Sequence, residues 1–370
     1  MKKNSISLIA VLLIGSYSFS VNAQDDISNI FKSGVADMNK VAEGYLNPAG
    51  KSFAVGLGSN WYNTAAVHKT WGFDITIGAG AVQAPSSDQT FSLLGLTNLV
   101  PANSSITQAP SFTGSGDGVL LNLMQPKTIN GKANPLFPGK ITSFTTPSGV
   151  SKNVPTASIQ FTIGLPIIND LSIRLVPTVK VNGYEASIWG VGIKHNIKQW
   201  IPVVKDLPFD AALLLAYSKF DMKYSFPEES RITPDKLVSG GSVSYIPDPN
   251  SNDYTTQGMK VSAASKTVNL IFSKKILFVT PFIGFGVTQS DFTLTMVGNF
   301  PTLGETVQSG TSYKVQIKNE VDPINLAPPS ETMTNATLGL RLKLAFFTLH
   351  AQYAFQKYPV ASAGFGVTFR

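Results

Sequence analysis

The sequence predicts an all-β protein, a transmembrane antiparallel β-barrel of the bacterial outer membrane, and three observations support this fold class. The chain begins with a secretory signal, its later segments alternate apolar and polar residues, and no later apolar run could form a membrane helix. The longest such run, Ala211 to Tyr217, falls far short of the roughly 20 residues that a spanning helix needs. Barrel strands need only about 9–11 residues each, because alternate side chains face lipid and lumen.

Residues 1–23 have the three parts of a signal peptide. Lys2 and Lys3 supply the positive charge, Ile6 to Phe19 forms the apolar region, and Val21-Asn22-Ala23 is a small-residue cleavage site. We therefore expect the mature chain to begin at Gln24.

Composition excludes several classes of chemistry. The chain has no cysteine, which excludes disulfides and thiol ligands. Its net charge of +7 falls to +5 without the signal peptide, and no dense Lys/Arg tract indicates nucleic-acid binding. Only three histidines are present, without clustered carboxylates or a serine motif. We therefore expect no enzyme, no catalytic residues, no metal site and no cofactor.

Alternation is clearest in Ala157 to Leu165, Leu171 to Val181 and Ala336 to Phe346. In each segment one set of alternate positions is apolar, and the other is mostly Gly, Ser, Thr or charged. A soluble β-sandwich would show the same period. The strand length of about 11–14 residues and a second face typical of a water-filled lumen favour the membrane barrel.

The predicted strands number twelve, with fourteen as the alternative, and the barrel covers residues 51–370. Strands should begin near Phe53, Lys69, Pro155, Leu171, Ser187, Pro208, Gln257, Ile276, Glu331, Phe347 and Pro359. Polar stretches near 98–153, 226–256 and 299–330 are the expected extracellular loops. If both chain ends are periplasmic the number of strands is even, so one strand is missing from these eleven, and Gln89 to Thr97 is the place we expect it.

Five basic residues fall on the polar face of the predicted strands. They are Arg174, Lys180, Lys194, Arg341 and Lys343. Facing the lumen, they would attract anions or fatty-acid carboxylates. The alternative is that they lie near strand ends or pair with inward Asp74, Asp210 and Asp291.

Residues 24–50 are the predicted N-terminal helix or hatch. Within them, Asp25 to Gly44 have helical rather than strand spacing, and Gly44 could end the helix. The apolar positions are Ile27, Ile30, Phe31, Met38 and Val41. Such an amphipathic helix would either enter the lumen as a plug or lie on the periplasmic rim. A frayed linker is the other interpretation.

Tyr45 to Gly50 follows, containing Asn47-Pro48-Ala49 and leading into the strand expected from Phe53. A helical hatch, an Asn-Pro-Ala motif and then a barrel resemble the long-chain fatty-acid transporter (FadL) superfamily of outer-membrane proteins. The whole chain is also similar to a group of such barrels that share Val191-Gly192-Ile193-Lys194-His195 running into Gln199-Trp200-Ile201-Pro202, a likeness that implies no activity.

The superfamily resemblance implies a hatch that blocks the lumen, with Asn47 and Pro48 fixing its junction to the barrel. It also implies an apolar ligand pocket and a gap in the wall that releases the ligand sideways into the membrane. This chain departs from the superfamily in its short hatch and in having fewer than the usual fourteen strands.

The function we expect is passive uptake of small hydrophobic compounds through a plugged lumen. The alternative is a non-transporting structural or adaptor barrel that binds a secretion or envelope partner, as some relatives in the superfamily do. A general porin is a third hypothesis. The expected partners are outer-membrane lipid, a hydrophobic small-molecule ligand and, under the alternative, an envelope protein.

Overall fold

The computed structural model describes residues 35–369, apart from 126–127, 130–131, 134–137, 168, 201–206, 239–244, 249, 251 and 310–311. The predicted signal peptide and the hatch residues Ile27, Ile30 and Phe31 lie outside the described residues. Within them, no helix is both long enough and apolar enough to cross a bilayer.

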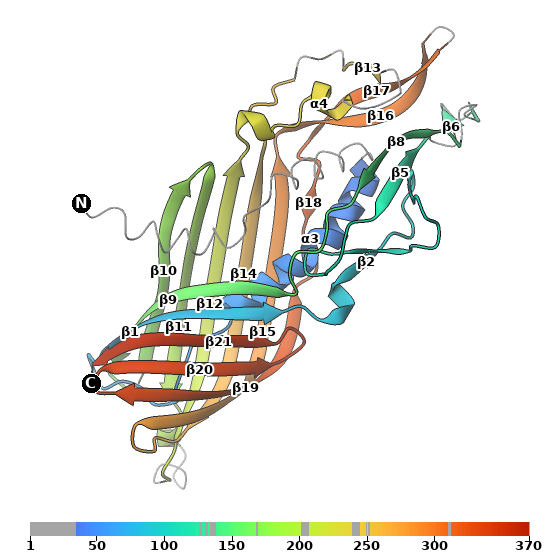
Figure 1. The fold of residues 1–370 in the computed structure, drawn as a ribbon. Coiled ribbons are helices and arrows are strands. Elements are labelled where there is room, and N and C mark those ends of the chain that lie inside the picture. Colours follow the sequence, from blue (N-terminus) through green and yellow to red (C-terminus); the bar gives the residue numbers. More distant parts are fainter. Residues whose placement is uncertain are drawn as a thin grey trace.

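The described residues form a closed antiparallel β-barrel of ten strands (Figure 1). In order around the barrel they are β1 (Phe73–Gln83), β9 (Asn153–Leu165), β10 (Asn169–Val181), β11 (Tyr184–Asn196), β12 (Asp210–Ser225), β14 (Gly258–Ser273), β15 (Val279–Val297), β19 (Glu331–Leu344), β20 (Phe347–Phe355) and β21 (Val360–Phe369). β21 pairs with β1 and closes the ring. The predictions of twelve and of fourteen strands are therefore wrong, although the even parity is correct.

The two missing strands have separate causes. The segment around Phe53 belongs to a helix, α3 (Val35–Leu57). Gln89 to Thr97 contains only the three-residue β2 (Thr90–Ser92), which pairs with β4 (Gln108–Pro110) outside the barrel. The other ten predicted strand starts each fall within a few residues of an observed one.

Helix α3 extends well beyond the predicted end at Gly44 because it is enclosed by the barrel. It contacts β1, β9, β12, β14 and β15, so residues on several of its faces are buried. Ala54, Val55 and Leu57 are all buried, and closely spaced apolar residues of this kind resemble the alternation of a strand. Pro48 lies inside the helix rather than at a junction with the barrel.

The barrel's outer face is apolar. Alternate residues of each strand are exposed and hydrophobic, as a lipid-facing wall would be. Examples are Ile75, Phe161, Ile173, Leu215, Val268, Phe285, Leu338, Leu349 and Phe365.

The two ends of the barrel differ. The end that carries residues 166–167, 197–200, 207–209, 274–278 and 345–346 is called here the short-turn end, and β1 begins there beside the end of β21. The opposite, long-loop end carries the described residues of the segments 84–152, 226–257 and 298–330. Two short connections also lie at this end. One is residues 356–359 between β20 and β21, and the other is the turn where Asn182 and Gly183 both have positive φ, as a two-residue hairpin requires.

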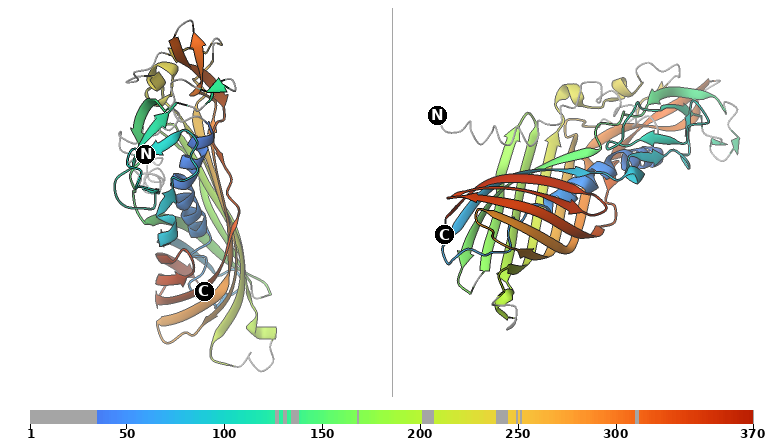
Figure 2. Two further views of the ribbon diagram at one scale, coloured as in Figure 1. Left: turned by 90° about the vertical axis from the view of Figure 1, so that its right-hand side faces the viewer. Right: turned by 60° about the horizontal axis from the view of Figure 1, so that its bottom comes forward.

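The long-loop segments form small sheets and turns beyond the barrel (Figures 1 and 2). Their elements are η2 (Ser86–Asp88), β3 (Leu99–Pro101), β5 (Leu120–Met124), β6 (Thr128–Ile129), β7 (Lys132–Ala133), β8 (Lys140–Thr145), η4 (Glu228–Ser230), α4 (Pro234–Val238), β13 (Tyr245–Ile246), β16 (Asn299–Ser309) and β17 (Ser312–Val321). The short β18 (Asn325–Leu326) pairs instead with the end of β15, and η3 (Lys198–Trp200) lies at the short-turn end. The first half of α3 packs among the long-loop elements, since Met38 and Val41 share a buried cluster with Leu99 and Leu121. The helix therefore starts at the long-loop end and runs into the barrel.

Candidate functional site

Beyond α3 the chain continues through the barrel as an extended stretch, Gly58–Gly72, here called the lumen segment. At its start, Thr267 of β14 donates a hydrogen bond to the carbonyl of Gly58. At its end, Gly72 pairs with Gly164 of β9, just before β1 begins at the short-turn end. Helix α3 and the lumen segment together form a plug that traverses the barrel from end to end.

Glycines in the wall make room for the side chains of the lumen segment. Four inward glycines on three strands lie against these side chains: a Cβ atom added at three of them would clash with one, and a Cβ added at Gly190 would lie 3.2 Å from Trp61. The glycines are Gly78 beside Asn60, Gly190 and Gly192 beside Trp61, and Gly284 beside Tyr62. The glycine-rich inner face that predicted a water-filled lumen is thus occupied here by protein.

Arg174 of β10 holds the end of the helix. Its guanidinium donates hydrogen bonds to the carbonyls of Leu57 (3.1 Å) and Ser59 (2.9 Å), and its Nε donates to Gln160 (3.1 Å). The same group lies 3.8 Å above the ring of Trp61. The charge is buried without a salt bridge among the described residues, so carbonyls at the negative end of α3 and a π-face stabilise it.

A second polar cluster fixes the lumen segment near the short-turn end. The buried carboxylate of Asp170 accepts a hydrogen bond from the backbone N–H of His68 (2.8 Å) and forms an ion pair with Lys194 (3.0 Å). Lys194 also donates to the carbonyl of Ala66 (2.8 Å). His68 lies 3.6 Å from Asp74 on β1. One buried ion pair therefore joins two wall strands to the plug.

Two further contacts tie the plug to the opposite wall. The hydroxyls of Thr64 and Ser273 are 3.1 Å apart, and Nε2 of His350 lies 2.8 Å from Oδ1 of Asn60. The lumen segment is thus held by hydrogen bonds and ion pairs and also by apolar packing. In the apolar cluster, Trp61, Tyr62 and Ala65 share a buried core with wall residues that include Leu214, Ile271 and Phe282.

The barrel wall is incomplete between β9 and β10. These strands pair only from Asn169 with Leu165 to Arg174 with Gln160. Beyond that point, Leu175–Val181 of β10 pairs only with β11, and Asn153–Ile159 of β9 only with β1, within the described residues. We call this stretch the unpaired seam; it opens toward the long-loop end, and Arg174 lies at its apex.

Prolines account for the seam. Ala84 donates to the carbonyl of Lys152, and hydrogen-bonded pairs alternate along an antiparallel ladder. Pro155, three residues later, therefore points its nitrogen away from β1 and toward the seam, where it cannot donate. On the other side, Pro177 lies within a β-bulge between Val176 and Val179. Both edges of the seam thus resist continued pairing.

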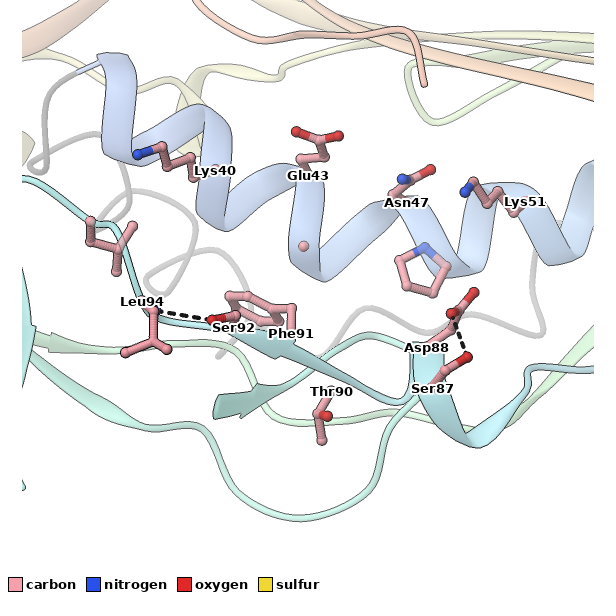
Figure 3. Close-up of a pocket in the computed structure, with 13 residues that line it drawn as sticks. Lys40, Glu43, Asn47, Lys51, Ser87, Asp88, Thr90, Phe91, Ser92 and Leu94 are labelled. Atoms are coloured by element: carbon pink, nitrogen blue, oxygen red, sulfur yellow. Dashed lines mark hydrogen bonds between the residues drawn. The ribbon is translucent and has the colours of Figure 1, made fainter. Parts of the chain in front are cut away.

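An open groove at the long-loop end leads along α3 toward the barrel (Figure 3). It is lined by Lys40, Glu43, Gly44, Asn47, Pro48 and Lys51 of the helix, and by Ser87, Asp88, Thr90, Phe91, Ser92, Leu94 and Leu96. The lining mixes apolar and charged side chains. The Oδ1 atom of Asn47 is buried there without a hydrogen-bond partner among the described residues. Such a groove suits an amphipathic molecule.

The residues singled out from the sequence fall in different places. Met38 and Val41 are buried against the loop assembly, whereas Asn47 and Pro48 line the groove. Arg174 and Arg341 are buried on the inner face, and Lys343 is half-buried on that face at the short-turn end. The lumen segment, with Trp61 and His68, was not singled out, because it has no period and no motif.

Lys180 lies on the outer face and not in the lumen. The bulge between Val176 and Val179 inserts an extra residue, which reverses the inward and outward positions that follow it. Lys180 is consequently exposed and pairs with Glu185 across the β10–β11 hairpin (2.8 Å). Of the carboxylates considered as partners for the basic residues, Asp291 also lies on the outer face, paired with Ala264.

We expect Gly284→Leu to loosen the plug, because the added side chain occupies the space of Tyr62. Overpacking of this kind costs about 1–3 kcal/mol. In planar bilayers the variant should show frequent channel openings where the wild-type protein is closed. Ile283→Leu, on the outer face of the same strand, is the control. If both variants stay closed to the same extent, the assignment of the lumen segment as the plug is wrong.

We expect Asp170→Asn to lower stability strongly, because it leaves Lys194 buried without its counter-charge. Breaking a buried pair costs roughly 3–5 kcal/mol, whereas removing both charges costs much less. The temperature at which the folded band disappears in a heat-modifiability gel should drop for Asp170→Asn and recover in Asp170→Asn/Lys194→Gln. A double variant no more stable than the single one would refute the ion pair's role.

Comparison with solved structures returns outer-membrane proteins at low similarity. The translocator domain of the autotransporter NalP from Neisseria meningitidis is 10% identical, with 92% of this chain and 99% of that chain covered and a TM-score of 0.28. The attachment invasion locus protein Ail of Yersinia pestis is 8% identical (81% and 100% covered, TM-score 0.26). A Pseudomonas aeruginosa FadL homologue is also 8% identical (89% and 96% covered, TM-score 0.21). Scores this low carry no conclusion about function.

No curated protein matches the sequence. A family model does match, over residues 1–369. The chain therefore belongs to a family of unknown function, DUF6588.

Proposed function

We propose that this protein is a bacterial outer-membrane barrel that passes small hydrophobic compounds and releases them sideways through the unpaired seam. The outer wall supports the membrane location, because exposed apolar residues cover it on all sides. Aromatic rings mark both edges of this apolar wall. At the short-turn end Phe73 packs on Phe369 (5.0 Å between ring centres), and toward the long-loop end Trp189 packs on Tyr217 (5.2 Å).

The observation that carries the proposed route is the seam itself. The seam starts where Leu175 pairs with Trp189, at the upper edge of the apolar wall, so it exposes the lumen side to lipid at that edge without breaking further hydrogen bonds. An apolar molecule that leaves there avoids water, whereas exit through an aqueous channel would require hydration of its apolar surface. The amphipathic groove along α3 is the proposed entrance.

The plug is the proposed gate. The lumen segment is held by directional polar contacts, of which those of Arg174 lie at the seam's apex, and by the packing of Trp61 and Tyr62 against the wall. A modest shift of the lumen segment would release the polar contacts and separate this apolar cluster, which is much smaller than the cluster that holds the first half of α3. This arrangement suits a plug that moves while the barrel stays intact.

One observation favours the alternative function, an adaptor barrel that binds an envelope partner. The loop segments have their own buried cluster around Leu121, Phe144 and Phe300, which continues onto α3. A packed assembly outside the barrel would offer a firm docking surface. An adaptor predicts a stable complex in mild detergent and no dependence of uptake on the protein.

We expect Phe285→Arg to impair membrane insertion. Phe285 is exposed on the apolar part of β15, where a buried arginine costs about 2–4 kcal/mol. Thr293→Arg, outward on the same strand but nearer the long-loop end, should cost about 0–1 kcal/mol. The measurement is the fraction of protein in the outer-membrane fraction that migrates as a folded band. Equal insertion of both variants would argue against a lipid-facing wall.

We expect a disulfide between plug and wall to stop uptake. The Thr64 and Ser273 hydroxyls are 3.1 Å apart, so Thr64→Cys/Ser273→Cys places two thiols in reach in a chain with no other cysteine. Uptake of radiolabelled dodecanoate and toluene by cells producing this variant should be lost on oxidation and return on reduction. Glucose serves as the hydrophilic comparison.

The control is Thr162→Cys/Ser172→Cys, whose hydroxyls are 2.9 Å apart on β9 and β10. It joins two wall strands and leaves the plug free, so uptake should persist after oxidation. Uptake that continues through the plug-locked protein, or that never exceeds that of cells without the protein, would refute the gated route.

A further inference from the structure

The outward-facing residues of β11, β12, β14 and β15 change from apolar to polar and charged along the strands. Outward residues toward the short-turn end are apolar, and the strands then continue past Trp189 and Tyr217 toward the long loops. Register places four lysines on this upper outward face: Lys219 and Lys223 on β12, and Lys260 and Lys266 on β14. We call these four residues the lysine face.

Two of these lysines face each other directly. Lys223 is the cross-strand partner of Lys260, and both side chains are exposed. Like charges directly opposite one another destabilise a sheet. Glu185 lies on the other side of Lys223, where it is paired with Lys180. An anion bound at this level would offset the repulsion.

The remaining charges on this face only partly neutralise it. Lys219 forms an ion pair with Asp221 (3.0 Å), and Asp291 lies on β15 next to Ala264. Lys266 has Tyr217 and Gln289 as its neighbours across the sheet. Neither Lys260 nor Lys266 forms an ion pair with any described residue.

We propose that the lysine face binds the phosphate groups of an anionic lipid in the leaflet on the long-loop side. This inference rests on the proposed membrane location. The level is that of lipid headgroups, because Trp189 and Tyr217 mark the boundary of the apolar wall just below it. Lysines at this level extend their alkyl chains along the wall and place their ammonium groups among the headgroups.

A lipid fits this surface better than a soluble anion does. The lysines lie along a convex wall over several residue levels and not around a pocket, so a small ion would meet few of them at once. A lipid that carries more than one phosphate would reach several, and its acyl chains would cover the apolar residues below, among them Leu215 and Val268. Each lysine near an anionic membrane surface contributes about 1 kcal/mol.

The test uses the full-length protein in detergent with diphosphorylated lipid A as the probe. We expect binding, measured by native mass spectrometry and by a rise in unfolding temperature, to weaken about 10- to 30-fold in Lys260→Gln/Lys266→Gln. The control, Lys140→Gln/Lys152→Gln, removes the same charge from two exposed loop lysines and should bind like the wild-type protein. Dephosphorylated lipid A should bind weakly to all three proteins.

Wild-type affinity in Lys260→Gln/Lys266→Gln, or an equal loss in the control, would overturn the proposal. Stabilisation by millimolar inorganic phosphate alone, abolished by the same double variant, would identify a free-anion site and would also overturn it. The uptake assay separates the two proposals. If Lys260→Gln/Lys266→Gln inserts and transports normally but binds lipid A unchanged, only the lipid site fails.

Discussion

The size of the barrel is the constraint on which the rest of this structure depends. Eight strands enclose a space that inward side chains can fill, and the ten described strands enclose more than that. The surplus is filled by α3 and the lumen segment, which explains why the inner wall combines glycines with hydrogen-bonding side chains. Gly190 and Gly192 leave room for Trp61, while Arg174 and Lys194 satisfy plug carbonyls that would otherwise be buried without partners.

The direction of the plug has a further consequence. Helix α3 starts among the long loops, where Asp37 accepts hydrogen bonds from the backbone of Thr97 and Asn98. The chain then passes through the lumen before β1 pairs with β21 and closes the ring. A plug that precedes the first strand has to be in place when the wall closes, since its two ends emerge at opposite ends of the barrel. The polar contacts with β1, β10 and β11 thus join the plug to strands that lie on either side of β9.

The sequence predicted the wall far better than its contents. Alternation located ten strand starts because each wall residue meets the same two environments in turn, lipid and lumen. The same rule misread Phe53, since an enclosed helix buries several faces, and it placed Lys180 inward because the bulge before Val179 has no apolar signature. The lumen segment has no pattern at all: Asn60, Trp61 and Tyr62 each meet a different strand, so their partners are fixed only by the closed fold.

The seam requires a positive physical explanation, because two adjacent antiparallel strands normally continue to pair. Pro155 removes a donor on one edge, and the bulge at Pro177 displaces the other edge, so continued pairing along the seam would leave backbone groups without partners. Prolines of this kind also protect unpaired edges from pairing with another chain. The last paired residues, Arg174 and Gln160, bind the plug as well as each other. The pairing of β9 with β10 therefore ends at the residues that hold the plug. A shift of the plug would change the contacts of these same residues at the apex of the seam.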